Sequence, residues 1–392
     1  MVEIPKGLPP LGGMSVTTFL QDYWQQQPLI IRQAFPDFET PLSPEELAGL
    51  SCEEEVNSRI IIEKGGDHSW QAIHGPMTEE IFASMPETHW TLVVNDLEKT
   101  IPELAWITDQ FRFIPEWYLD DLMSSYAAPE GTVGPHFDLY DVFILQGSGQ
   151  RRWQISTQPV AEDNIIPDVA IRLQKDFTAE IEWILEPGDM MYLPAGVSHY
   201  GVSIGESMSY SIGFKATSHE ALVSDFIAYI TRELPISKTY HLPNEGLATH
   251  PAQITAAAIA EIRTIFKNYL DPQHPQLARW FGSFVSDSKT DFVLECEQPV
   301  DSFEQLLALQ KKFAVPLLRH PASRFAFTAA GQPQAVMLFV DGQELNVSKT
   351  FVYQLCDQRT IDLMKLSRLM NENERDLLLD LYNAGKLYFA NE

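Results

Sequence analysis

A histidine and an aspartate interrupt an otherwise apolar segment of the sequence, GPHFDLYDVFIL, which runs from Gly134 to Leu145. We interpret this segment as a buried strand, on which His136 and Asp138, two residues apart, point to the same face. A buried charge is unfavourable unless it is paired or bound to a metal ion. The segment therefore predicts that these two side chains belong to a binding site.

A second motif supplies a third possible ligand. In LEPGDMMYLPAGVSHYGVS, residues 185–203, a Pro-Gly-Asp turn and a short strand precede a turn that delivers His199 to the start of another strand. Strands distant in sequence lie side by side in a jelly roll, so His199 can face His136 and Asp138. Two histidines and one carboxylate with open positions are the ligands of non-haem Fe(II) oxygenases. We predict a metal site made of these three residues.

The strand that carries the first motif continues into GSGQRRW, which ends in Arg151, Arg152 and Trp153. Alternation allows only one of the two arginines to face the interior. A buried guanidinium requires an anion, and its planar fork suits a carboxylate. Beside an iron site, this favours a cosubstrate with a distal carboxylate, such as 2-oxoglutarate. The alternative is a surface arginine paired with one of the many acidic residues, and the pattern alone does not decide between them.

Strands dominate the region that carries these motifs. Runs rich in β-branched and aromatic residues, separated by Gly, Pro and Asp turns, predict strands at 58–63, 90–96, 122–129, 141–156, 181–194 and 208–214. Many short strands at this spacing indicate a β-sandwich or barrel of the jelly-roll type.

Upstream of these strands, the chain mixes a helix at 15–27 with a strand at 28–35 and a second helix near 43–50. Ser43 and Glu46 have the spacing of a capping box at the start of that second helix. We therefore expect an α/β elaboration in front of the jelly roll.

Helical periodicity replaces the strand pattern after residue 215. Apolar residues at helical spacing predict helices at 220–234, 254–270 and 276–287. Large apolar helices outside a barrel favour a dimer interface.

The last part of the chain, from about residue 300, predicts a helix at 302–313, a hairpin at 324–347 and two C-terminal helices. This combination is typical of a winged-helix module, which usually binds DNA. Residues 301–392 carry ten Lys and Arg against eleven Asp and Glu, without a basic stripe. We therefore expect the module to contact protein or to stabilise a dimer rather than to bind nucleic acid.

The composition restricts the class of protein further. The chain has 392 residues, 45% of them hydrophobic, and a net charge of −27. Such acidity argues against non-specific binding to nucleic acid or anionic membrane, and favours either a cationic partner or simple solubility. Three widely spaced cysteines allow no disulfide framework, which fits a reducing cytosol. We expect neither a signal peptide in MVEIPKGLPPLGG nor a membrane span, because no long apolar run exists.

Taken together, PHFDLYDVFILQGSGQRRW, LEPGDMMYLPAGVSHYG and the N-terminal FLQDYWQQQPLIIRQAF resemble the JmjC/cupin-type 2-oxoglutarate oxygenases, specifically the bacterial ribosomal oxygenases. The resemblance implies an α+β fold: a double-stranded β-helix at 1–214, a helical dimerisation region at 215–299 and a winged-helix-like domain at 300–392. It implies Fe(II)- and 2-oxoglutarate-dependent hydroxylation, with O2, of an arginine Cβ in a 50S ribosomal protein, giving succinate and CO2. A cytoplasmic homodimer is expected.

The resemblance also assigns roles to individual residues. His136, Asp138 and His199 match the iron ligands, and Arg151 matches the arginine that binds the cosubstrate carboxylate. Ser125 matches a second cosubstrate contact, and Met208, on the strand after His199, is expected to line the same pocket.

Three further residues are possible contacts for a cationic substrate side chain. Asp120 and Asp121 precede the strand of Ser125, and Tyr140 shares the face of His136 and Asp138 by alternation. For the two aspartates, a turn or helix end is an equally good explanation.

Three alternatives to arginine hydroxylation stay open at this point. The target could be a histidine of a ribosomal protein, as in the human relatives of this group. The protein could instead be a metal-binding cupin without oxygenase activity, which Arg151 argues against. A chromatin- or DNA-directed JmjC demethylase is the third, and the acidic balance of the chain argues against it.

Overall fold

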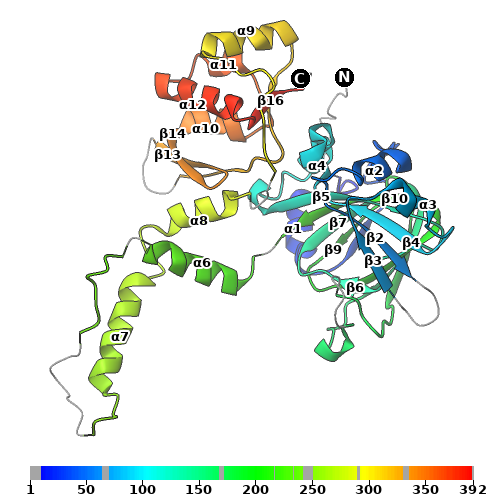
Figure 1. Ribbon diagram of the computed structural model, residues 1–392, viewed down its shortest axis with the longest axis horizontal. Helices are drawn as coiled ribbons and strands as arrows, with labels where there is room; N and C mark the ends of the chain where they lie inside the picture. The colour runs from blue at the N-terminus through cyan, green and yellow to red at the C-terminus, as the bar shows by residue number, and fades with distance from the viewer. Residues whose placement is uncertain are drawn as a thin grey trace. The chain divides into compact units, whose positions relative to one another are not determined.

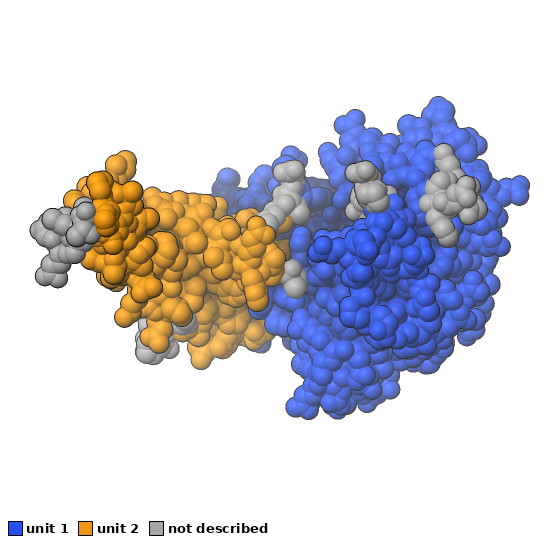
Figure 2. All heavy atoms as spheres, turned by 90° about the horizontal axis from the view of Figure 1, so that it is seen from below, with its two compact units in different colours: residues 1–216, 290–323, 358–392 blue, residues 217–289, 324–357 orange. Residues whose placement is uncertain are grey.

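A computed structural model describes residues 10–63, 70–166, 172–215, 217–232, 234–241, 250–288, 292–329 and 335–390. The chain forms two compact units, drawn in different colours in Figure 2. Unit 1 comprises residues 1–216, 290–323 and 358–392, and unit 2 comprises 217–289 and 324–357. None of the described helices is long and apolar enough to cross a membrane.

The largest sheet of the described residues has ten strands, all paired antiparallel, and belongs to unit 1. Its main path runs β1-β9-β7-β10-β5-β4-β2-β3, while β6 pairs with β10 and β8 pairs with β7. The strands are β1 (Leu29–Ile31), β2 (Ser58–Glu63), β3 (Trp70–His74), β4 (Trp90–Val94), β5 (Leu119–Ala127), β6 (His136–Phe137), β7 (Asp141–Ser156), β8 (Ile181–Leu185), β9 (Met190–Leu193) and β10 (Ser198–Phe214).

Short helices cover one side of this sheet, as Figure 1 shows for α2 and α4 beside β4 and β5. Ser43 caps α2 and forms the predicted capping box with Glu46. The helical segments are α1 (Val16–Asp22), α2 (Pro44–Leu50), α3 (Glu79–Ala83), α4 (Leu97–Thr100), η1 (Pro102–Leu104), α5 (Ala105–Asp109), η2 (Glu116–Tyr118) and η3 (Glu162–Asn164).

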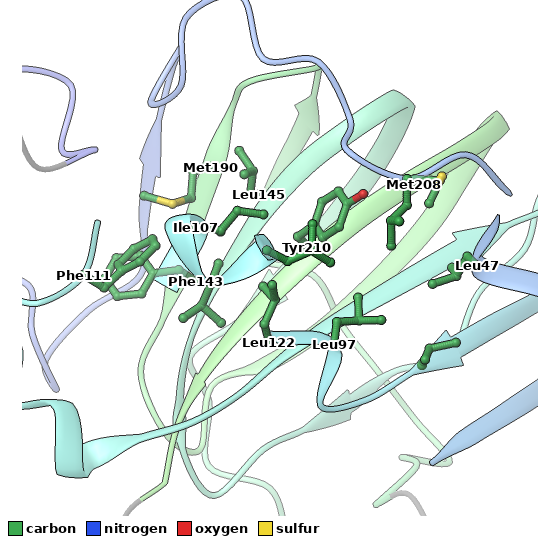
Figure 3. Close-up of a cluster of buried hydrophobic side chains, with 14 of the residues drawn as sticks. Leu47, Leu97, Ile107, Phe111, Leu122, Phe143, Leu145, Met190, Met208 and Tyr210 are labelled. Carbon is green, nitrogen blue, oxygen red and sulfur yellow. The ribbon is translucent and has the colours of Figure 1, made fainter. Parts of the chain in front are cut away.

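Alternation along the strands separates a hydrophobic core from a polar interior. On β10, Met208, Tyr210 and Ile212 are fully buried in the main core cluster, which they share with side chains of α2 and α5 (Figure 3). The residues between them, Ser209 and Ser211, line a cavity on the opposite face. The same two-residue period holds on β4, β5 and β7, so one face of the sheet is core and the other is the wall of a pocket.

The chain is bent where the sequence predicts one continuous strand. Residues 134–145 form the two-residue strand β6 and the start of β7, and residues 138–140 between them lie outside any strand. Asp138 therefore follows β6 instead of lying within a strand, and its carbonyl accepts a hydrogen bond from the Gly196 amide. The bend still leaves His136 and Asp138 beside each other, with Nε2 and Oδ2 3.9 Å apart, and β6 pairs His136 directly with His199 on β10.

Unit 1 also contains part of the C-terminal region, arranged around a small sheet of order β15-β11-β16. A bidentate pair of hydrogen bonds joins Arg319 to Glu116, at 2.9 and 3.0 Å, and holds this region against the jelly roll. The elements are α9 (Phe303–Phe313), β11 (Leu317–Arg319), β15 (Thr360–Ile361), α11 (Leu363–Leu366), α12 (Glu372–Asn383) and β16 (Leu387–Phe389).

Unit 2 combines helices with a three-stranded sheet of order β12-β13-β14. Gly282 lets the helix α8 (Leu277–Ser286) approach this sheet closely, because a Cβ at position 282 would lie 2.2 Å from the Phe339 ring. The elements are α6 (His219–Thr231), α7 (Ala256–Tyr269), α8 (Leu277–Ser286), β12 (Phe325–Thr328), β13 (Ala335–Val340), β14 (Gln343–Ser348) and α10 (Lys349–Cys356).

The predicted mixture of jelly roll, helices and winged helix is confirmed, and the C-terminal part is richer than expected. The three-stranded sheet β12-β13-β14 replaces the hairpin predicted at 324–347, whose residues 330–334 lie outside the described residues, and the sheet β15-β11-β16 was not predicted. The helices predicted at 254–270, 276–287 and 302–313 are present to within two residues at each end. The three domain boundaries stay a prediction.

Candidate metal and cosubstrate site

His136, Asp138 and His199 converge at one point of the jelly roll. Their ligand atoms all lie within 4.8 Å of one another. The Asp138 Oδ2 atom is 3.9 Å from His136 Nε2 and 3.7 Å from His199 Nε2. These separations leave room for an ion between the three atoms, since nitrogen and oxygen ligands lie about 2 Å from a transition metal.

The second nitrogen of each histidine fixes which atom faces the centre. His136 Nδ1 is 2.9 Å from the Gly134 carbonyl, and His199 Nδ1 is 3.0 Å from the Val197 carbonyl. A carbonyl only accepts, so each Nδ1 carries the proton and each Nε2 presents a lone pair. Burial lowers the pKa of His199 to about 4, which keeps the ring neutral, the form that binds metals. The donor set therefore fits a divalent transition metal.

Tyr140 supports the carboxylate of this cluster. Its hydroxyl donates a hydrogen bond to Asp138, and burial, followed by the Asp138 charge, raises the pKa of Tyr140. The phenol thus stays protonated at all ordinary pH values. A donor on one carboxylate oxygen restricts the rotation of Asp138 and orients it as a ligand.

Arg151 provides an isolated positive charge in the same cavity. The residue is 5% exposed. Its guanidinium donates to three neutral hydroxyls: Nη1 to Ser125 (3.0 Å) and Ser209 (2.9 Å), and Nη2 to Ser207 (3.1 Å). Burial lowers its pKa to about 10, so it is still charged at neutral pH. No carboxylate of the described residues forms an ion pair with it.

Arg151 and the histidine–aspartate cluster lie within one continuous pocket. The pocket has a volume of about 450 Å³ and is lined by His136, Asp138, His199 and Arg151. Arg151 pairs with Ser203, four residues beyond His199 on β10, a backbone distance of about 13 Å at 3.3 Å per residue. The cation and the metal ligands are thus separated by a space suited to a short, bifunctional acid.

Two buried polar atoms in the pocket wall have no hydrogen-bond partner among the described residues. Thr91 Oγ1 and Trp153 Nε1 are inaccessible to water and make no hydrogen bond. The Trp153 ring lies across from Gly201, where a Cβ would come within 2.6 Å of it. A buried polar atom without a partner is unfavourable, so these two atoms reduce the stability of the pocket wall.

Met208 does not line this pocket, which corrects one prediction. Its side chain is fully buried in the hydrophobic core, beside Tyr210 (Figure 3). Alternation on β10 turns Ser207 and Ser209 to the cavity instead, and both bond Arg151. The signal was in the sequence: in ESMSYSIGF, serines alternate with apolar residues from 207 to 212, which is typical of a strand with one polar face.

The remaining predicted residues divide between two faces of β5. Met123 and Ser125 line the pocket, and Asp121, two positions before Met123, lies on the same face of β5 but outside the pocket lining. Asp120 alternates to the other face. Asp121 is close to Tyr140, because both come within 4 Å of the position that a Cβ would occupy at Gly213. The structure therefore brings Asp121 and Tyr140 together, beyond the metal ligands and away from Arg151.

Comparisons with known proteins agree with this geometry. A JmjC domain model matches residues 106–222, and a model of a ROXA-like winged helix matches residues 271–388. Among curated proteins, the chain is 36% identical over 284 residues to "Ribosomal protein uL16 3-hydroxylase" of Escherichia coli, covering 72% of this chain and 74% of that protein. It is 38% identical over 198 residues to "Probable ribosomal oxygenase" of Haemophilus influenzae, covering 50% of this chain and 48% of that protein.

Solved structures extend the similarity over nearly the whole chain. The E. coli protein YcfD superposes with a TM-score of 0.84 at 29% identity, covering 96% of this chain and 98% of that one. A further structure, titled as the E. coli ribosomal oxygenase YcfD with cobalt and 2-oxoglutarate, has a TM-score of 0.81 and covers 96% and 99% of the two chains.

Proposed function

The chain belongs to the JmjC-type ribosomal oxygenases, and from this premise we propose that it uses Fe(II), 2-oxoglutarate and O2 to hydroxylate an arginine Cβ of a large-subunit ribosomal protein. The E. coli relative is named for uL16. That protein is accordingly the first substrate to test.

The observation that carries the proposal is the unpaired buried charge of Arg151. A buried guanidinium whose hydrogen bonds go only to hydroxyls is stable when an anion joins it. The distal carboxylate of 2-oxoglutarate would supply that anion, and His136, Asp138 and His199 would hold the metal in the same pocket, where the 2-oxo acid end would bind. A cupin that merely binds a metal has no need of this cation.

Each of these residues has a distinct part in the reaction. His136, Asp138 and His199 would hold the metal, and their hydrogen bonds to backbone carbonyls and to Tyr140 keep them in place. Bound Fe(II) with 2-oxoglutarate and O2 supplies the oxidising chemistry: one oxygen atom enters the substrate C–H bond and the other enters succinate, with release of CO2. Arg151 orients the cosubstrate.

The apolar part of the pocket keeps bulk water away from the reacting groups. Val142, Ile144 and Trp153 line the cavity and pack in a separate buried cluster with Ile155 and Leu185. Exclusion of water protects the oxidising centre from side reactions.

Asp121 and Tyr140 are proposed to hold the substrate side chain. Burial raises the pKa of Asp121 to about 6, so the carboxylate is ionised at neutral pH and can bind a guanidinium. Asp120 is not assigned this role, because alternation turns it away from the cavity. A peptide with citrulline in place of the arginine is expected to be a poor substrate. Turnover of that peptide at the arginine rate would refute the charge-based grip.

The experiment that tests the function is intact-mass analysis of ribosomal proteins from cells with and without this protein. We expect one large-subunit protein to gain the mass of one oxygen atom, and fragmentation to place it on an arginine. Placement on a histidine would support the alternative, a histidyl hydroxylase. Absence of any change, with no release of succinate from 2-oxoglutarate, would favour a cupin without oxygenase activity.

The protein is further proposed to act as a homodimer through α6 and α7. No residue of α7 is buried, and Ile259, Ile262 and Phe266 are exposed, Phe266 by 59%. Val223 and Ile227 on α6 are also exposed. Light scattering should report a dimer that Phe266→Asp weakens and the matched change at an exposed polar residue, Thr264→Asp, does not. A monomeric wild-type protein would contradict this proposal.

The proposed substrate places the protein in the cytoplasm, where ribosomal proteins are made. The winged-helix region is proposed to contact protein and not nucleic acid, since its charges nearly cancel. A salt-sensitive gel shift with DNA would contradict that assignment.

A further inference from the structure

An asparagine next to the pocket connects two charged side chains of opposite sign. Asn95 follows β4, and its Nδ2 donates to Asp121 Oδ2 at 3.0 Å. Its Oδ1 accepts from Arg59 Nη1 at 3.2 Å. A guanidinium only donates and a carboxylate only accepts, so the amide can stand in one orientation alone. The three side chains form a directed chain of hydrogen bonds that ends on Asp121.

The second oxygen of Asp121 is left for another partner. A Cβ at Gly213 would lie 3.1 Å from Asp121 Oδ1 and 3.8 Å from the Tyr140 ring, so this oxygen is directed toward the neighbourhood of Tyr140. Gly213 leaves that space open. Because Asn95 occupies Oδ2, the carboxylate keeps a fixed rotation with Oδ1 directed toward Tyr140, which lines the pocket.

Arg59 lines the pocket but forms no ion pair within the described residues. Its Nε is buried and has no hydrogen-bond partner. A direct Arg59–Asp121 pair would neutralise the carboxylate and compete with a cationic ligand. The interposed neutral amide fixes the carboxylate and leaves its charge unpaired.

We propose that Asn95 and Arg59 are positioning residues that hold Asp121 with one oxygen bound and the other free, which makes the pocket selective for a guanidinium. This rests on the proposed function, in which the target is an arginine. Arg59 acts through Asn95, and Asn95 acts through Asp121, so neither residue touches the reacting carbon.

The electrostatic surroundings of Asp121 agree with this role. Burial raises the pKa of Asp121 to about 6, and the hydrogen bond from Asn95 is the largest influence that lowers it. Loss of that bond raises the pKa further, so binding of a cationic peptide would fail at a higher pH than in the wild type. The other charged or titratable groups that face Asp121 are Asp120, Asp96, Lys99, Glu98 and Tyr140.

The test uses the full-length protein and a uL16 peptide that contains the target arginine. Asn95→Ala should raise the KM for the peptide about tenfold, the usual effect of losing a hydrogen bond to a charged group, and leave the KM for 2-oxoglutarate unchanged. The acid limb of the kcat/KM profile should move to higher pH. Arg59→Lys, which keeps the charge but not the planar fork, should give a smaller change in the same direction.

The matched control is Gln158→Ala. The Gln158 amide also donates to a carboxylate, Glu180, but both residues are exposed outside the pocket. This variant should behave as the wild type in each assay.

Two outcomes would overturn the inference separately from the proposed function. An unchanged peptide KM and an unchanged acid limb in Asn95→Ala would remove the positioning role. Equal increases in the KM for peptide and for 2-oxoglutarate would make Asn95 a general structural residue. Failure of the wild-type protein to hydroxylate any arginine would instead overturn the proposed function, and with it the selectivity for guanidinium.

Discussion

The site has two charged ends, Arg151 inside the pocket and Asp121 beside the pocket lining, and the fold holds the two charges by different means. Arg151 is fully enclosed and bonded by serines of two neighbouring strands, β5 and β10, so its position is fixed by the sheet. Asp121 is half-buried, and a single amide, Asn95, fixes it. The difference fits the two proposed ligands: a small cosubstrate of constant shape at the closed end, and one side chain of a large protein at the other.

The largest expected effect comes from removing the metal ligands, which lie between Arg151 and Asp121. His136→Ala and Asp138→Ala should each abolish turnover, because both ends then act on a pocket without a complete set of metal ligands. Succinate release and peptide hydroxylation, measured together, check this. Iron- and 2-oxoglutarate-dependent hydroxylation retained in both variants would sink the assignment of the ligands.

The closed end is tested by Arg151→Ala. Removal of a buried charge that pairs with a ligand carboxylate should raise the KM for 2-oxoglutarate by about 100-fold or more, with little change in the KM for the peptide. Arg151→Lys keeps the charge and should recover part of the loss. An Arg151→Ala protein with wild-type affinity for 2-oxoglutarate would show that the cosubstrate binds elsewhere.

The other end is tested by Asp121→Asn, which removes the charge and keeps the shape. We expect an increase of about tenfold in the KM for the peptide, with the KM for 2-oxoglutarate unchanged, which is the reverse of the Arg151 result. If both variants affected the same ligand, the two ends would not be functionally distinct.

The charge at this end also predicts a pH dependence. Since the pKa of Asp121 is about 6, the carboxylate takes up a proton as pH falls through that value, and binding of a cationic peptide weakens below it. The peptide KM of the wild-type protein should therefore rise on acidification. Asp121→Asn should have the high KM at every pH, without this step.

The smallest expected effect concerns Glu98, which holds the backbone of β5 next to Asp121. Glu98 is 2% exposed and accepts a hydrogen bond from the Leu122 amide on β5, and burial raises its pKa to about 8. Between pH 4.5 and about 8, Glu98 is protonated in the folded protein and ionised in the unfolded chain. The free energy of unfolding therefore falls as pH rises through this interval. Glu98→Gln should lessen the decline of Tm across this interval. An identical decline in both proteins would show that Glu98 is ionised in the fold.

Prediction from the sequence succeeded where a signal is local. The period of two along β2 and β7, and the capping box at Ser43, gave elements whose observed ends match. It failed at Met208, which was expected to face the cosubstrate although the alternation of serines with apolar residues from 207 to 212 indicates the opposite face. It also failed where neighbours in space decide. The bend at 138–140 was missed because its cause, pairing of β6 with β10, is not local.

By itself, the sequence determined the kind of chemistry: His136, Asp138, His199 and Arg151 are chemically specific, and alternation puts the first two on one face. Tertiary structure decided what completes the site. The serines around Arg151, the orphaned Thr91 hydroxyl, and the hydrogen-bonded series Arg59, Asn95 and Asp121 come from strands that are adjacent only in the folded sheet. Whether two side chains form a hydrogen bond depends on differences of a few tenths of an ångström in the distance between donor and acceptor, and no spacing along the chain specifies these distances.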